Sequence, residues 1–171
     1  MMWPSVALLS FVTLQRLAEL IYARRNTAQL LSQGAREIAR EHYPGLVALH
    51  ITWLGGLWWL ALDRQIEWIW FTVFALMQLM RVWVLHSLGR RWTTRIIVLP
   101  GAHLVANGPY QFMRHPNYVI VTVELAALPL AFGLTGYAVF FSLINAILLF
   151  VRIRAEDAAL RTPAPAERSA T

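Results

Sequence analysis

Cysteine and lysine are both absent from the 171 residues of this chain. Without cysteine, the chain has no disulfides, thiolate metal sites or cysteine nucleophiles. Without lysine, it has neither a Schiff-base lysine nor the lysine of a P-loop, and all 15 basic residues are arginine. Single histidines such as His50 and His86 have no partner at metal-ligand spacing, so we expect no metal site.

Charge is also scarce, because charged residues make up only 14% of the chain. An ordinary soluble domain has about 25%. Hydrophobic residues make up 58%, and they include eight Trp and eight Phe. The net charge of +6 comes from arginines that flank apolar runs, so it indicates a membrane protein and not a nucleic-acid partner. The length suits one domain.

Long apolar runs predict an all-α, polytopic membrane protein with about five transmembrane helices. The runs are Trp3 to Tyr22, Leu46 to Leu62, Ile66 to His86 and Tyr118 to Val151. The last run would reach about 50 Å as one helix, which exceeds the roughly 30 Å of a bilayer core. Gly133 to Gly136 is expected to divide it into a hairpin. The N-terminus lacks a basic region and a cleavage site, which favours a retained helix over a signal peptide.

The arginines predict an orientation with the N-terminus outside and the C-terminus in the cytoplasm of a bacterial inner membrane. In this layout only Arg64 faces out, which satisfies the positive-inside rule. Twelve arginines face the cytoplasm: Arg24, Arg25, Arg36, Arg40, Arg90, Arg91, Arg95, Arg114, Arg152, Arg154, Arg161 and Arg168. An interfacial helix is expected within the first loop (23–42). Residues 1–160 form the predicted domain, with 95–160 as its core and 161–171 as a disordered tail.

Four ionisable residues interrupt the apolar runs. Arg16 and Glu19 are three residues apart, so a neutralising pair is expected, although Arg16 holding an anionic group is the alternative. Arg81 is expected to snorkel to the interface. Glu124 has no basic residue one turn away. It is either a protonated side chain that bonds His50 or Arg81 on a neighbouring helix, or a carboxylate that lines a substrate pocket.

The segment NGPYQFMRHPNY (107–118) combines rigidity, charge and aromatic rings. Pro116 suits the first turn of a helix, which places His115 near the N-cap. Gly108 permits close approach of the backbone, and Arg114 offers a fork for a carboxylate or phosphate. The segment therefore suits either a ligand cradle or an anchor to lipid headgroups.

The end of the last apolar run carries a charged helical segment, RIRAEDAAL (152–160). Arg152 and Glu156 are four residues apart and are expected to pair. The segment is either an ordinary charged helix exit or, because it lies at the same membrane face as 107–118, the second wall of one pocket.

Together these segments resemble the isoprenylcysteine carboxyl methyltransferase family and the related phospholipid methyltransferases. The matches are Leu104-Val105, Gly108-Pro109-Tyr110, Arg114 to Tyr118, and Arg152 to Leu160 with Asp157 in place of a second Glu. Ile120 replaces a frequent Gly, and the aromatic-rich segment of eukaryotic members is missing. The chain is therefore more similar to the short bacterial branch, which includes methyltransferases for alkylpyrones and alkylresorcinols.

The resemblance implies binding of S-adenosylmethionine on the cytoplasmic side and a lipophilic acceptor that enters from the bilayer. It places the cofactor against Gly108, Tyr110, His115, Pro116, Tyr118 and Glu156. We hypothesise that Arg114 or Arg152 orients the cofactor carboxylate or the acceptor oxyanion. Glu124 or His115 is the candidate base for a phenol. The alternatives are a phospholipid N-methyltransferase and a non-enzymatic membrane scaffold or carrier subunit.

Overall fold

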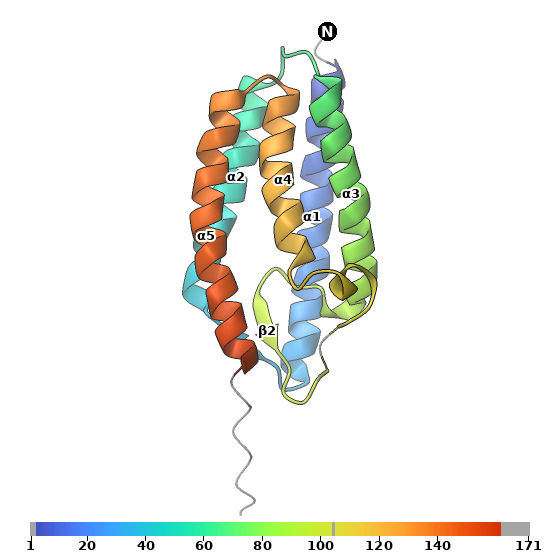
Figure 1. Ribbon diagram of the computed structural model, residues 1–171, viewed down its shortest axis with the longest axis vertical. Coiled ribbons are helices and arrows are strands. Elements are labelled where there is room, and N and C mark those ends of the chain that lie inside the picture. The colour runs from blue at the N-terminus through green and yellow to red at the C-terminus, as the bar shows by residue number, and fades with distance from the viewer. Residues whose placement is uncertain (1–2, 104, 162–171) are drawn as a thin grey trace, which may run out of the picture.

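Five helices lie side by side in the computed structural model, which describes residues 3–103 and 105–161 (Figure 1). The helices are α1 (Trp3–Ser32), α2 (Tyr43–Leu60), α3 (Trp68–Leu88), α4 (Pro116–Ala131) and α5 (Thr135–Arg161). Short 3-10 turns, η1 (Arg40–His42), η2 (Gly89–Arg91) and η3 (Gly108–Gln111), lie in the connections. Strands β1 (Arg36–Ile38) and β2 (Ile96–Val98) form an antiparallel pair in which Glu37 faces Ile97.

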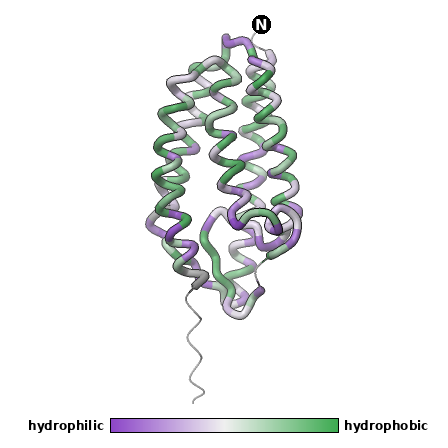
Figure 2. The backbone as a smooth tube through the Cα atoms, in the orientation of Figure 1, coloured by the Kyte–Doolittle hydropathy of each residue, from purple (hydrophilic) through white to green (hydrophobic). Residues whose placement is uncertain are grey.

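The outer surface of the bundle is that of an integral membrane protein. Large apolar side chains such as Trp59, Ile69 and Ile147 are exposed, and hydrophobic residues run along most of the helical length (Figure 2). Three helical segments are long and apolar enough to cross a bilayer: Trp3–Ser32, Trp68–Arg91 and Thr135–Ala158. Helices α2 and α4 are shorter, with 18 and 16 residues. The expected all-α membrane fold is confirmed.

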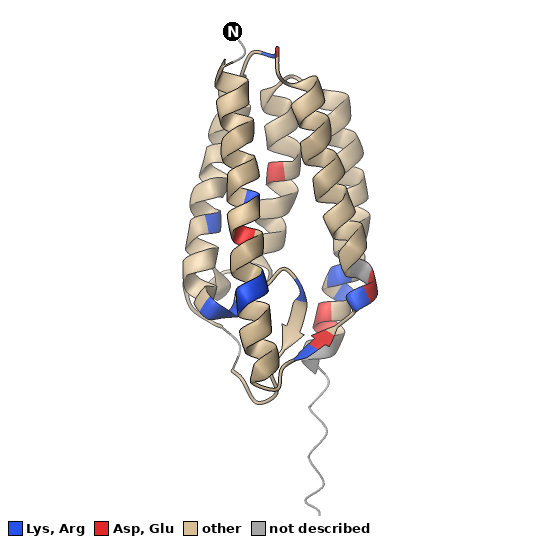
Figure 3. Ribbon diagram, turned by 180° about the vertical axis from the view of Figure 1, so that it is seen from behind, with Lys and Arg blue, Asp and Glu red and all other residues tan. Residues whose placement is uncertain are grey.

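The two ends of the bundle differ in charge and in structure. The N-terminus and the α2–α3 and α4–α5 connections lie at one end (Figure 1). The strand pair, η3 and the C-terminal end of α5 lie at the other, where most of the charged residues gather (Figure 3). The charge asymmetry predicted from the arginines is therefore present along the bundle axis. Arg168 and the rest of the predicted tail from 162 onward lie outside the described residues.

Helix α1 runs ten residues beyond the predicted span and replaces the start of the predicted interfacial helix. Asn26 is buried, and its Nδ2 donates to the backbone oxygens of Gly89 (3.3 Å) and Trp92 (2.9 Å). These bonds hold the end of α1 against the connection that follows α3. Strand β1 and the 3-10 turn η1 follow within the rest of the predicted segment, so the expectation of an interfacial helix was wrong.

The C-terminal hairpin forms where the glycines predicted it. Helix α4 ends at Ala131, and α5 begins at Thr135. Gly133 has a φ of 69°, a left-handed conformation that glycine adopts without a steric penalty. Backbone bonds from Gly133 N to Leu130 O (2.9 Å) and from Leu134 N to Pro129 O (2.9 Å) close the turn. The hairpin sets the charged end of α5 beside the start of α4.

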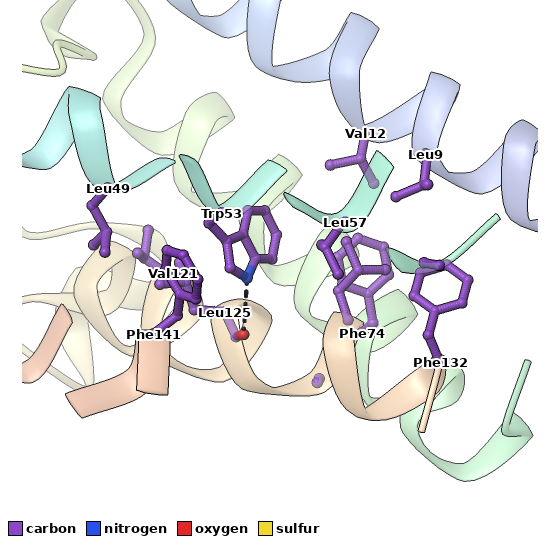
Figure 4. Packing of buried hydrophobic residues seen from close by; sticks show 13 residues of the cluster. Leu9, Val12, Leu49, Trp53, Leu57, Phe74, Val121, Leu125, Phe132 and Phe141 are labelled. Atoms are coloured by element: carbon purple, nitrogen blue, oxygen red, sulfur yellow. Dashed lines mark hydrogen bonds between the residues drawn. The ribbon is translucent and has the colours of Figure 1, made fainter. Parts of the chain in front are cut away.

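The core between the helices is apolar and centred on Trp53 of α2 (Figure 4). Its indole Nε1 donates to the Leu125 backbone oxygen at 3.2 Å, and the side chain is buried. Tyr137 of α5 donates to the Trp53 backbone oxygen at 2.8 Å. These bonds join α2, α4 and α5 near the middle of the bundle. They hold in place helices that line the cavities described below.

Candidate functional site

A cavity of about 460 Å³ lies at the charged end of the bundle. Its wall combines apolar groups of α1 and β2 with polar groups of the following loop, the start of α4 and the end of α5. The polar and aromatic lining residues are Arg91, Trp92, Thr93, Arg95, His103, Tyr110, Arg114, His115, Asn117, Tyr118, Arg152, Glu156 and Asp157. Small-molecule sites commonly have volumes of about 300–1,000 Å³, so this cavity has the size of a ligand site.

Two residues of segment 107–118 shape the loop from behind the cavity wall. Gly108 has a φ of 59°, and a Cβ at this position would clash with the Ser87 hydroxyl of α3. Pro116 is buried in the first turn of α4, and His115 is the N-cap residue. The close contact at Gly108 and the helix start at Pro116 fix both ends of the loop, so His115 and Tyr118 face the cavity.

Tyr118 links the two predicted halves of the site. Its hydroxyl donates to a Glu156 carboxylate oxygen and accepts from Arg152 Nε at 2.9 Å. Arg152 also donates through Nη2 to the Thr94 backbone oxygen at 2.8 Å. The predicted Arg152–Glu156 pair is therefore indirect, because both side chains bond the same phenol. This arrangement orients the guanidinium across the cavity wall.

His115 lies above the Tyr118 ring and close to two carboxylates. The ring centroids are 5.2 Å apart and the planes are within 18° of parallel. His115 Nδ1 is 3.8 Å from Glu156 Oε2, and Nε2 is 3.4 Å from Asp157 Oδ1. The segments RHPNY (114–118) and RAED (154–157) thus lie together at one site. This agrees with the prediction that the end of the last helix forms the second wall of one pocket.

Tyr110 contributes a neutral hydroxyl to this cavity. Burial raises the pKa of Tyr110 to about 12, and the negative charge of Glu156 adds to the shift. At neutral pH the Tyr110 hydroxyl therefore remains protonated and is able to donate a hydrogen bond.

Three buried polar atoms around this cavity have no hydrogen-bond partner among the described residues: Trp92 Nε1, Asn117 Oδ1 and Asp157 Oδ1. An unpaired buried donor or acceptor costs about 1–3 kcal/mol. One donor, Trp92 Nε1, and one acceptor, Asn117 Oδ1, therefore remain for a ligand; Asp157 Oδ1 is a further acceptor that lies 3.4 Å from His115 Nε2. S-adenosylmethionine carries an ammonium, hydroxyls, an adenine amine and acceptor nitrogens, so the donor set fits this cofactor.

A second cavity of about 360 Å³ lies between the helices. Its lining is mostly apolar and comes from α1, α2 and α4, with Leu17, Leu20, Ile51 and Leu54 among the residues. Polar groups of Arg16, Glu19, His50 and Arg81 also reach it. The two cavities share five lining residues: Trp92, Thr93, Asn117, Tyr118 and Arg152. They therefore meet at the Tyr118–Arg152 hydrogen bond.

Glu124 lies outside both walls and belongs to a buried charge cluster of Arg16, Glu19, Arg81 and Glu124. Arg16 Nη2 donates to Glu124 at 2.6 Å, and Arg81 donates to it through Nε at 2.9 Å and through Nη2. Arg81 Nη1 also donates to Glu19 at 3.0 Å. Arg81 is buried and does not snorkel, so that expectation was wrong. Glu124 bonds neighbouring helices, through both arginines and without His50.

The cavity wall contains most of the predicted site residues but also several that sequence reasoning missed. Tyr110, Arg114, His115, Tyr118, Arg152 and Glu156 line the first cavity; Gly108 and Pro116 lie behind it, and Glu124 lies in the charge cluster. Trp92 and Asn117 were missed, although Asn117 lies inside the quoted motif, and so was Thr94, which lines the second cavity and accepts a hydrogen bond from Arg152. Leu104 lies outside the described residues. Among the described residues, no three His, Asp or Glu side chains gather as a metal site would require.

The comparisons with known proteins place this chain in a family. The chain is 40% identical over 174 residues to the Bacillus subtilis (strain 168) protein named "Uncharacterized protein YpbQ", and the match covers 94% of this chain and 97% of the relative. No solved structure matches. Residues 68–162, more than half of the chain, match the isoprenylcysteine carboxyl methyltransferase (ICMT) family. This stretch contains η3, α4 and α5 and, apart from Leu30 of α1, every residue that lines the first cavity. The chain belongs to the ICMT family.

Proposed function

We propose that the protein is an S-adenosylmethionine-dependent methyltransferase that methylates an oxygen, of a carboxyl or a hydroxyl group, on a lipophilic acceptor. The observation that carries this proposal is the junction of the two cavities. The cavity at the charged end of the bundle, which has the more polar lining of the two, shares Tyr118 and Arg152 with the mostly apolar cavity between the helices. A water-soluble cofactor in the first cavity and a lipid acceptor in the second would therefore meet at Tyr118 and Arg152.

The first cavity supplies groups for each part of the cofactor. Asp157 and Glu156 are carboxylates that suit its ammonium, and Arg114 or Arg152 suits its carboxylate. The faces of Tyr110 and Tyr118 suit a planar base or a cation. When bound, the cofactor supplies an electrophilic methyl group on a sulfonium.

At the junction, the protein's own task is to position the acceptor and to exclude water. Arg152 is held by Tyr118 and Thr94, so its guanidinium is preorganised beside both cavities. A fixed cation at this place stabilises negative charge on an acceptor oxygen. A carboxylate acceptor is already ionised near neutrality and needs no base, whereas a hydroxyl acceptor does.

The charge asymmetry along the bundle supports one orientation of the protein in the membrane. The charged end, which contains the first cavity, is assigned to the cytoplasm of a bacterial inner membrane because arginine-rich loops are retained on that side. The cofactor then enters from the cytoplasm, and the N-terminus lies outside.

Calorimetry of S-adenosylhomocysteine binding to the detergent-purified protein tests this function. Wild type is expected to bind saturably. His115→Ala removes a polar group of the wall and Glu156→Gln removes a negative charge from it, so each is expected to weaken binding at least about tenfold. His86→Ala and Glu41→Gln change the same residue types at exposed positions outside both cavities and are expected to bind as wild type. Absence of binding by folded wild type, with or without a lipid extract, would point to the scaffold alternative.

A further inference from the structure

His50 of α2 lies in the second cavity and has no role in the function proposed above. It lies in the middle of α2, one turn beyond Leu46, and lines the cavity together with Arg16, Tyr118 and Arg152. Most of the other lining residues are apolar, with Leu17, Leu20, Ile51 and Leu54 among them, and Glu19 and Arg81 also reach this cavity. A histidine in this position faces the space in which the acceptor would lie.

The hydrogen bonding of His50 determines its tautomer. Nδ1 is 2.8 Å from the Leu46 backbone oxygen. A carbonyl oxygen only accepts, so Nδ1 must carry the hydrogen. In the neutral ring Nε2 then has the free lone pair and is the basic atom. The bond to Leu46 also fixes the ring, so Nε2 keeps one direction.

The other two candidate bases are occupied elsewhere. Glu124 is fully buried and bonded by Arg16 and Arg81, so it is closed to an acceptor in either cavity. His115 lies in the first cavity, stacked on Tyr118 and beside Asp157. Glu19 also lines the second cavity, but Gln15 Nε2 donates to it at 2.9 Å and Arg81 Nη1 donates to it at 3.0 Å. A hydroxyl acceptor in this cavity therefore meets His50, a base that no arginine bonds among the described residues.

Arg16 supplies a donor on the same wall. Its Nη atoms bond Glu19 and Glu124, but its Nε is buried and has no hydrogen-bond partner among the described residues. An unpaired N–H of a guanidinium favours an oxygen that gains negative charge. The second cavity thus presents the base His50 and the donor Arg16 Nε in mostly apolar surroundings, which Glu19, Arg81 and Arg152 also reach.

We propose that His50 is the general base for methylation when the acceptor oxygen belongs to a neutral hydroxyl. This inference rests on the proposed methyltransferase function. The acceptor O–H bond breaks and its proton passes to His50 Nε2. The oxygen electron pair forms the new O–CH₃ bond, and the electrons of the breaking methyl–sulfur bond remain on sulfur, which leaves as a neutral thioether.

A chromogenic probe tests the proton transfer without the cofactor. The probe is 4-nitrophenol with an octyl chain, whose phenolate absorbs visible light. It is added to detergent-purified protein at a pH where the micelle-bound probe is neutral. Wild type is expected to give a saturable phenolate band. His50→Asn retains a donor for the Leu46 carbonyl but removes Nε2, and it is expected to bind the probe without ionising it. His86→Asn, the same change at an exposed histidine, is expected to behave as wild type.

Measurements of kcat then distinguish a role of His50 as general base from a role in packing alone. With an alkyl phenol as acceptor, His50→Asn is expected to lower kcat about 100-fold or more, the range of general-base catalysis. With a fatty acid as acceptor, which is already ionised, kcat is expected to change less than about threefold. Equal losses on both acceptors, or an unchanged kcat on the phenol, would overturn the proposal.

The outcomes also distinguish this inference from the proposed function. If wild type fails to bind S-adenosylhomocysteine, the methyltransferase function fails. If wild type binds it but leaves the bound nitrophenol neutral, only the role of His50 fails, and that result does not depend on any variant folding. His50→Asn is compared with wild type by S-adenosylhomocysteine affinity, which is expected to be unchanged because His50 lies outside the first cavity.

Discussion

Tyr118 is the residue on which the site depends most. Its hydroxyl bonds both Arg152 and Glu156, its ring stacks on His115, and it lines both cavities. One side chain therefore positions the cation at the junction and the carboxylate beside the cofactor groups. These contacts link the tyrosine at the start of α4 to the charged segment at the end of α5.

Tyr118→Phe is expected to weaken S-adenosylhomocysteine binding about tenfold and to lower kcat further. The ring remains stacked, but Arg152 and Glu156 lose their common partner, and a hydrogen bond to a charged group contributes about 1.5–3 kcal/mol. Calorimetry and methyl-transfer rates measure the two effects. Tyr22→Phe, at an exposed tyrosine of α1, is the matched control. Unchanged affinity and rate in Tyr118→Phe would show that this hydroxyl does not organise the site.

At the scale of elements, the buried charge cluster joins three helices of the bundle. Glu124 of α4 is bonded by Arg16 of α1 and Arg81 of α3, and Arg81 also bonds Glu19 of α1. The two positive and two negative side chains leave the cluster formally neutral. It borders the second cavity and holds the helices that enclose it.

Glu124→Gln is expected to lower the stability of the bundle by about 3–5 kcal/mol, because breaking a buried ion pair leaves its partners uncompensated. Thermal unfolding in detergent measures this loss. Glu41→Gln, at an exposed position of η1, is expected to have little effect on the unfolding temperature. If Glu124→Gln unfolds at the wild-type temperature, the cluster does not contribute to helix packing.

Gly108→Ala is expected to displace η3 from α3 and weaken cofactor binding. Its φ of 59° is strained for alanine, at about 1–3 kcal/mol, and its Cβ would clash with Ser87. Gly34→Ala is a matched control, because Gly34 has a φ of 89° with open space around it. Both variants should lose stability, but only Gly108→Ala should lose affinity for S-adenosylhomocysteine. Equal affinities would exclude a role for this close contact in shaping the site.

The elements that the sequence predicts correctly are those with local signals. Gly133 marks the hairpin, and Pro116 marks the start of α4 with His115 at its N-cap. The strand pair and the charge cluster depend on residues far apart in the chain. Arg16 and Glu124 are separated by 108 residues, so no helical spacing reveals their bond. The partners of Arg81, Glu19 and Glu124, are also far from it in the chain. The sequence around Arg81 therefore predicted a side chain that snorkels to the interface.

The whole molecule has one charged end and one end with few charges, and this asymmetry predicts its orientation in the membrane. Because the chain has no cysteine, a single introduced cysteine is its one thiol, and the reaction of that thiol reports from which side of the membrane the position is accessible. Asp63→Cys, in the α2–α3 connection, is expected to react with a membrane-impermeant thiol reagent in intact cells. Gln33→Cys, after α1 at the charged end, is expected to react only after permeabilisation. The reverse pattern would place the first cavity outside the cell.

The most direct test of the whole account is transfer of a labelled methyl group from S-adenosylmethionine by the purified wild-type protein. An alkyl phenol, a fatty acid and phosphatidylethanolamine are offered as separate acceptors. The account predicts that label passes into an organic-soluble O-methyl product, stable to base if the acceptor is the phenol, and that Tyr118→Phe reduces this transfer. Label found only in phosphatidylethanolamine, or no transfer by a protein that binds the cofactor, would contradict it.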